Sequence, residues 1–89
     1  MSNENNFNEI WKKIRLHKGE IFTTTRGLEF TYSILGPWVV ISGSDFRITK
    51  SNFQLAFSMM PISEPEDFGN QIQGKYFVHA ILNDLRIKP

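Results

Sequence analysis

The sequence contains no cysteine among its 89 residues. Such a chain forms no disulfide, offers no thiolate to zinc and has no cysteine nucleophile. Its longest uncharged stretch, residues 30–44, is interrupted by threonine, serine, glycine and proline and is too short to span a bilayer. The opening residues MSNENNFNEI have no basic segment followed by an apolar one, as a secretory signal would. We therefore expect a cytoplasmic protein that does not associate with membranes.

Neither sign of charge dominates the chain. Ten Lys and Arg residues against nine Asp and Glu residues give a net charge of +1. This balance argues against a strongly basic nucleic-acid-binding module, but it leaves room for a local basic patch. Aromatic residues, at 13%, are plentiful. A chain of this length forms one small domain, and large aromatic side chains supply much of the core of such a domain.

The first regular element that we expect is a helix. Its apolar residues recur at the spacing of a single helical face. These residues are Phe7, Ile10, Trp11 and Ile14. Gly19 is a typical helix stop. We expect the polar residues 1–6 to be disordered and residues 7–87 to form a single domain.

From residue 20 onward the apolar period changes to two, which is typical of strands. We expect strands over residues 21–25, 28–34 and 38–42, and a short fourth strand over residues 46–48. Turn residues such as Gly27 and the pair Gly36–Pro37 separate them. These short connections favour an antiparallel β-meander of three to four strands.

Two further helices are expected after the strands. Thr49 or Ser51 can cap a helix with a regular apolar face that ends at Pro61. Residues 62–73 are rich in turn-forming and acidic residues and predict a surface loop. A last helix is expected from Lys75 to about Leu85. The predicted fold is α+β, an antiparallel meander packed by an N-terminal helix and two C-terminal helices, in the order α-β-β-β-(β)-α-α.

Sequence signatures of catalysis are absent. The zinc-protease, phosphate-loop, dinucleotide and nucleophile-elbow motifs do not occur. We expect His79 to be a hydrogen-bonded structural residue, and the alternative is a small hydrolase in which it works with a loop carboxylate. The acidic residues 64–67 do not have the ligand spacing of a calcium loop. We therefore predict a protein that is not an enzyme and that has no cofactor and no metal site.

Three basic segments are candidates for phosphate contacts. The run 12–18 holds four of the ten Lys and Arg residues and no acid, although a solvated helix face would show the same pattern. Arg26 follows three threonines at the first expected hairpin. Arg47 and Lys50 lie where a strand leads into a helix N-terminus, which attracts anions, but simple helix capping needs similar residues. The predicted nucleic-acid contacts are Arg26, Arg47, Lys50, Ser51, Lys12, Lys13 and Arg15.

Three segments carry a resemblance. They read G-E-x-F-x-T-x-x-G-x-x-F-x-Y over residues 19–32, I-T-K-S-x-F-x-x-A over residues 48–56 and G-K-Y-x-x-x-A-I-L-x-D-x-R-I over residues 74–87. Together they resemble a small bacterial domain of unknown function that occurs alone or beside nuclease and restriction-type domains. The resemblance covers about residues 7–87. It implies a nucleic-acid-associated accessory role and supplies no catalytic residues.

The function that these observations predict is a non-enzymatic binding module with a weak association with nucleic acid. The alternative is a protein-interaction or regulatory domain, in one version a homodimer. Four aromatic residues are candidates for the contact patch of that alternative. They are Trp38, Phe46, Phe68 and Tyr76.

Overall fold

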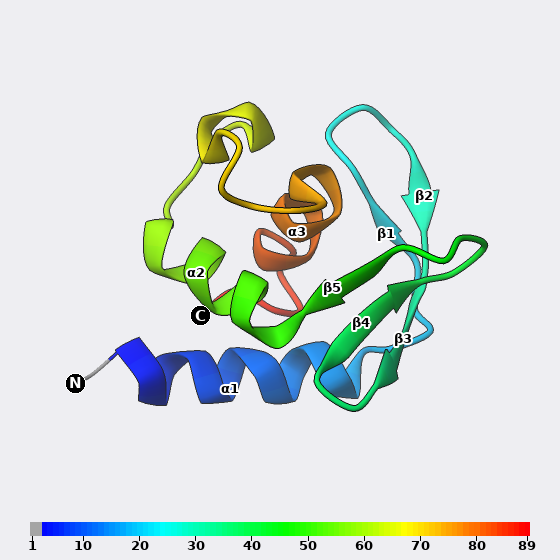
Figure 1. The fold of residues 1–89 in the computed structure, drawn as a ribbon, viewed down its shortest axis with the longest axis horizontal. Coiled ribbons are helices and arrows are strands. Elements are labelled where there is room, and N and C mark those ends of the chain that lie inside the picture. The colour runs from blue at the N-terminus through cyan, green and yellow to red at the C-terminus, as the bar shows by residue number, and fades with distance from the viewer. Residues whose placement is uncertain (1–2) are drawn as a thin grey trace.

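The computed structural model describes residues 3–89, which form three α-helices, five short strands and one 3-10 helix (Figure 1). The elements are α1 (Asn3–Leu16), β1 (Phe22–Thr23), β2 (Glu29–Phe30), β3 (Tyr32–Leu35), β4 (Trp38–Ile41), β5 (Arg47–Thr49), α2 (Lys50–Met59), η1 (Pro65–Phe68) and α3 (Lys75–Leu82). The α+β class and the order of elements are as expected. Residues 1–2, part of the segment expected to be disordered, lie outside the described residues, and α1 already begins at Asn3.

The strands form two antiparallel sheets. One contains β1 and β2, and the other has the order β3-β4-β5. The single strand expected over residues 28–34 is therefore wrong: it is divided at Thr31 into β2 and β3, which pair with different partners. The Thr31 carbonyl instead accepts a hydrogen bond from the Ser42 amide at 2.9 Å. The chain thus leaves one sheet at Thr31 and enters the other.

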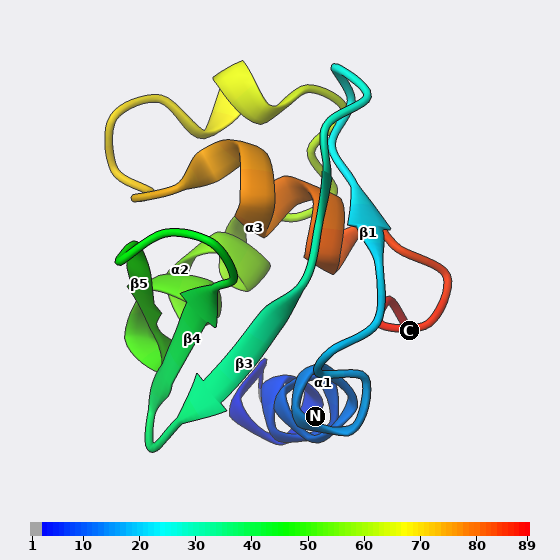
Figure 2. The same ribbon diagram turned by 90° about the vertical axis from the view of Figure 1, so that its right-hand side faces the viewer.

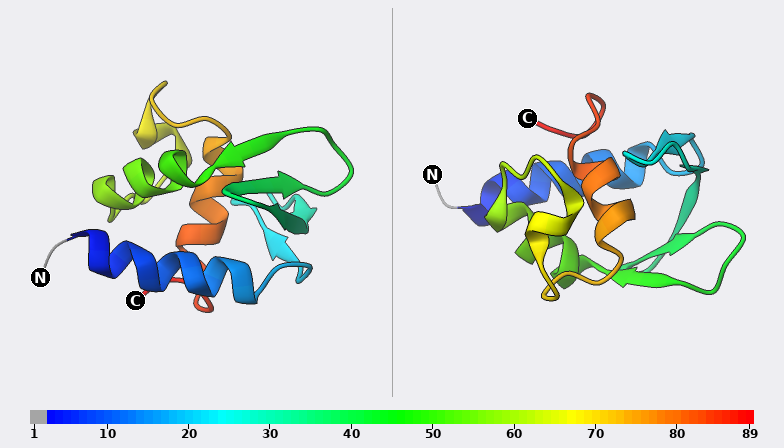
Figure 3. Two further views of the ribbon diagram at one scale, coloured as in Figure 1. Left: turned by 60° about the horizontal axis from the view of Figure 1, so that its bottom comes forward. Right: turned by 90° about the horizontal axis from the view of Figure 1, so that it is seen from above.

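The three-stranded sheet has one buried and one open face. Val39, Ile41 and Ile48 are buried, whereas their neighbours along β4 and β5 are partly or fully exposed. This alternation follows from the period of two in a strand. The buried face meets α2, α1 and α3 also pack against α2, and α3 packs against β1. Figure 3 shows β4, β5 and the loop between them projecting from the helices.

Residues 62–73 are more ordered than the sequence predicted. Instead of a surface loop, they contain η1, and Pro65, Phe68 and Ile72 are buried. His79 of α3 helps to hold this segment, because its Nε2–H donates to the carbonyl oxygens of Ile62 and Ser63 at 3.2 and 3.1 Å. Since both partners are acceptors, Nε2 carries the proton. This is the structural role expected for His79.

The last helix ends at Leu82, three residues earlier than expected. Beyond it, the Arg86 guanidinium donates two hydrogen bonds to Asp84, one to Glu20 and one to the Ile21 carbonyl, and it lies 3.9 Å from the centre of the Phe22 ring. Hydrogen bonding from Arg86 lowers the pKa of Asp84, and hydrogen bonding to Asp84 raises the pKa of Arg86. Arg86 therefore fastens the end of the described chain to β1.

Candidate nucleic-acid interface

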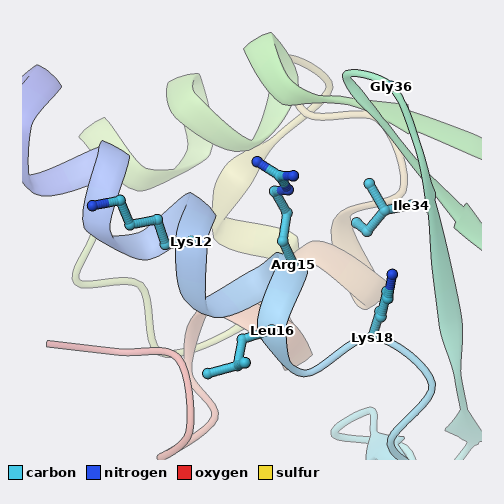
Figure 4. A pocket seen from close by; sticks show the side chains of 6 residues that line it. All are labelled: Lys12, Arg15, Leu16, Lys18, Ile34 and Gly36. Carbon is cyan, nitrogen blue, oxygen red and sulfur yellow. The ribbon is translucent and has the colours of Figure 1, made fainter.

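A pocket of about 520 Å³ lies between the end of α1 and the turn that joins β3 to β4 (Figure 4). Three of its six lining residues are cationic, and none of the six is acidic. The lining residues are Lys12, Arg15, Leu16, Lys18, Ile34 and Gly36. We call this site the basic pocket.

Helix periodicity explains why the cations gather on one side of α1. Arg15 follows Lys12 by three residues and the buried Trp11 by four, which places it beside both on one side of α1, and Lys18 follows in the turn after Leu16. Figure 4 shows Arg15 and Lys18 rising from this side, with Ile34 of β3 facing them and Lys12 nearer the start of the helix. The cations are thus held beside a hydrophobic wall.

The end of α1 is fixed to the strand that forms the other side of the basic pocket. The Tyr32 hydroxyl donates to the Ile14 carbonyl at 2.6 Å, and the Gly19 amide donates to the Tyr32 carbonyl at 2.8 Å. Tyr32 is only 1% exposed, and burial raises the pKa of its hydroxyl. Both sides of the basic pocket therefore belong to one rigid corner of the fold.

Lys50 joins this corner from the start of α2. Its amide donates to the Pro37 carbonyl at 2.7 Å, next to Gly36 in the turn that borders the basic pocket. Its ammonium lies 5.7 Å from the centre of the Trp11 ring, within the range of a cation–π contact. Lys50 therefore lies close to the basic pocket without lining it.

The helix cap beside Lys50 agrees with the sequence. The Thr49 hydroxyl accepts a hydrogen bond from the Asn52 amide at 3.1 Å, so Thr49, and not Ser51, is the N-cap of α2. Ser51 is exposed on the first turn. Its side chain is open to solvent beside Lys50.

Most cations of the basic pocket are not neutralised. Lys12 approaches Glu9 at 3.5 Å, but both side chains are more than two-thirds exposed, and such a pair contributes at most about 1 kcal/mol. In the part of the chain that the structure describes, no ion pair involves Arg15, Lys18 or Lys50. Their charge remains available to an anion.

Arg26 does not belong to this group. It lies at the tip of the β1–β2 hairpin, at the opposite end of the molecule from α1 (Figure 2). Its guanidinium donates to the Tyr76 hydroxyl at 3.2 Å and lies 3.5 Å from a Glu66 oxygen. The pKa of Glu66 is lowered, mainly by a hydrogen bond from the Glu66 backbone amide. The hydrogen bond from Tyr76 and the positive charge of Arg26 lower it further. This exposed pair is as weak as that of Lys12 with Glu9, so what separates Arg26 from the basic pocket is its place at the other end of the molecule.

Lys13 and Arg47 also point elsewhere. Lys13 is half-buried and follows Lys12 by about 100° around the helix, which directs it to the flank that carries His17. His17 pairs there with Glu20 at 2.9 Å. Arg47 lies on the open face of the three-stranded sheet, where its guanidinium is 4.9 Å from the centre of the Trp38 ring.

The structure thus brings together Lys12 and Arg15 from the predicted contacts, with Lys50 close by, and adds Lys18, which belongs to the basic run 12–18 but was not among the predicted contacts. Lys18 lies in the turn after α1, and its place depends on how that turn meets β3 at Tyr32. Among the aromatic residues suggested as a protein-contact patch, Phe68 is wrong because it is buried. Trp38, Phe46 and Tyr76 are at least partly exposed.

Other kinds of site find little support. Among residues 3–89, no three His, Cys, Asp or Glu side chains are grouped so that they could hold a metal ion. No helix in the same range is long and apolar enough to cross a membrane.

The resemblance to a bacterial domain found beside nucleases stays a prediction. No protein-family model, curated protein or solved structure matches this chain. The local geometry is therefore what supports a proposal about its function.

Proposed function

We propose that this chain is a non-enzymatic, cytoplasmic module that binds the phosphate backbone of nucleic acid at the basic pocket. The observation that carries the proposal is that Lys12, Arg15 and Lys18 line one pocket with no acidic lining residue, while Lys50 lies close by at the start of α2. Cations placed in this way attract phosphates and carry no sequence information. The proposal therefore concerns an accessory contact that tolerates different sequences.

The proposal predicts a measurable dependence on salt. If three or four cations each neutralise one phosphate, the slope of log affinity against log salt is about −2.1 to −3.6. The affinity then falls about 20- to 150-fold between 50 and 200 mM salt. Fluorescence anisotropy with labelled DNA and RNA across this range measures the slope directly.

Two charge-matched double variants test the site. Arg15→Gln with Lys18→Gln removes two cations of the basic pocket, and we expect a slope that is less steep by about 1.4 to 1.8. Lys13→Gln with Lys88→Gln removes the same charge elsewhere and should leave the slope nearly unchanged. If both double variants reduced the slope equally, net charge alone, and not the basic pocket, would attract the nucleic acid. The absence of binding to any nucleic acid at low salt and high micromolar protein would refute the proposal.

The alternative of a protein-interaction or homodimeric domain has weaker support. Large exposed apolar side chains are spread over separate elements, as single exposed residues often are. They are Leu16, Ile21, Leu28, Leu35, Phe46, Leu55 and Leu85. Sedimentation over a range of protein concentrations would detect a homodimer.

A further inference from the structure

The open face of the three-stranded sheet carries an aromatic–cation pair. Opposite the buried Val39, Ile41 and Ile48, it presents alternate residues of all three strands. These residues are Ser33, Leu35, Trp38, Val40, Arg47 and Thr49. None is acidic, and the only charge among them is the cation of Arg47. This face therefore combines an apolar surface with positive charge.

The pair has the geometry of a stacking platform. The Arg47 guanidinium lies 4.9 Å from the centre of the Trp38 ring, and Arg47 is exposed while Trp38 is partly exposed. A planar guanidinium on an aromatic ring offers its outer face to another flat group, and its N–H groups can still reach a phosphate. A nucleobase is such a flat group, since aromatic rings and arginine planes are the surfaces on which unpaired bases stack.

The platform and the basic pocket lie on either side of the turn that joins β3 to β4, because Ile34 of the pocket pairs with the buried Val39 whereas Trp38 lies on the open face. Gly36 lines the pocket, and Trp38 follows it by two residues, a separation of at most about 7 Å along an extended chain. Thr49, the residue before Lys50, is the strand partner of Trp38. A strand of nucleic acid that contacts both places passes around this turn.

We propose that the ligand of the proposed function is single-stranded nucleic acid, with phosphates in the basic pocket and an unpaired base stacked on the Trp38–Arg47 platform. This inference rests on the proposed function. A duplex keeps its bases stacked inside and offers only phosphates to the same surface. Because every base has a flat face, the platform tolerates different sequences and favours single strands over duplexes.

The test compares a labelled single-stranded oligothymidine of about 12 nucleotides with a duplex of the same length. We expect tighter binding of the single strand. Trp38→Ala should weaken the binding of the single strand by about 5- to 150-fold, the range for losing one stacked base, and leave duplex binding and the salt slope unchanged. Trp38→Phe keeps a ring and should retain most of the affinity. Leu35→Ala, an apolar truncation on the same face, is the control and should have little effect.

A second readout uses tryptophan fluorescence. The chain has two tryptophans, and Trp11 is buried, so quenching by the single strand should come from Trp38 and disappear in Trp38→Phe. Circular dichroism of each variant shows whether it is folded.

Three outcomes would overturn the inference. Equal binding of single strand and duplex, with no effect of Trp38→Ala, leaves the proposed function intact and refutes the platform. The absence of binding to both refutes the two proposals together. Self-association in sedimentation that Trp38→Ala abolishes would show that the face binds a second copy of the chain.

Discussion

Removal of the Tyr32 hydroxyl tests how the corner that holds the basic pocket is built. The last four carbonyls of a helix have no partner within the helix, and Ile14 is among these residues in α1. The Lys18 amide would donate to the Ile14 carbonyl if the helix continued, but it donates instead to the Arg15 carbonyl. Tyr32 supplies the missing donor at 2.6 Å. Tyr32→Phe keeps the ring and leaves the Ile14 carbonyl buried without this partner.

The expected loss follows from that unsatisfied carbonyl. A buried polar group that loses its partner costs about 1–3 kcal/mol. In a domain of this size, a loss of about 2 kcal/mol, the middle of this range, lowers the melting temperature by about 8–16 °C. Thermal unfolding monitored by circular dichroism measures this decrease. Tyr76→Phe is the control, because its hydroxyl lies between two partners on the surface and should contribute only about 0.5 kcal/mol.

The loss of stability in Tyr32→Phe should depend on pH. Burial raises the pKa of Tyr32 above its ordinary value of 10.0, so the folded state favours the protonated hydroxyl. This contribution is fully present below pH 10 and is lost as the pH rises through the raised pKa. The difference in stability between the natural protein and Tyr32→Phe should therefore narrow above pH 10. A melting temperature within about 2 °C of the natural protein, or a difference that widens in alkali, would refute this account.

Three further variants test the rest of the fold. Thr49→Ala removes the cap of α2 and should lower the free energy of unfolding in urea by about 1 kcal/mol, whereas Thr49→Ser should preserve it. Asp84→Asn should show less loss of stability than the natural protein as the pH falls through 3.8 and below, because Arg86 lowers the pKa of Asp84; equal acid titrations would contradict this. Gly74→Ala forces a side chain into φ +64° and places its Cβ 2.5 Å from the Phe46 ring, so we expect a loss of about 1–3 kcal/mol in urea; unchanged stability would contradict the strain.

The sequence predicted the parts of the fold that depend on local periodicity. The apolar spacing of α1, the cap at Thr49 and the turn at Gly36 are all as expected, because each depends on neighbours within a few residues. The division at Thr31 was not visible, since residues 28–34 alternate without interruption and only the choice of pairing partners divides them. The order within residues 62–73 was also missed, because it depends on burial against α3 and on His79.

The candidate site, too, could be predicted from the sequence only in part. The positions of Lys12 and Arg15 follow from helix geometry, whereas that of Lys18 depends on the turn after Leu16. The approach of Lys50 to Trp11 requires α1 and α2 to pack together, which no local pattern shows. The contacts of Arg26 with Glu66 and Tyr76, 40 and 50 residues later, depend on where these later segments fold, which no local pattern shows.

The contacts of Arg86 have a consequence for the order in which this domain forms during synthesis. Residues 20–22 leave the ribosome early, but the guanidinium that binds Glu20, the Ile21 carbonyl and the Phe22 ring arrives more than 60 residues later. A domain generally folds as a unit. Until Arg86 has been added, β1 therefore lacks the hydrogen bonds and the ring contact that this residue supplies, and the unit is incomplete until almost the whole of this sequence has been made.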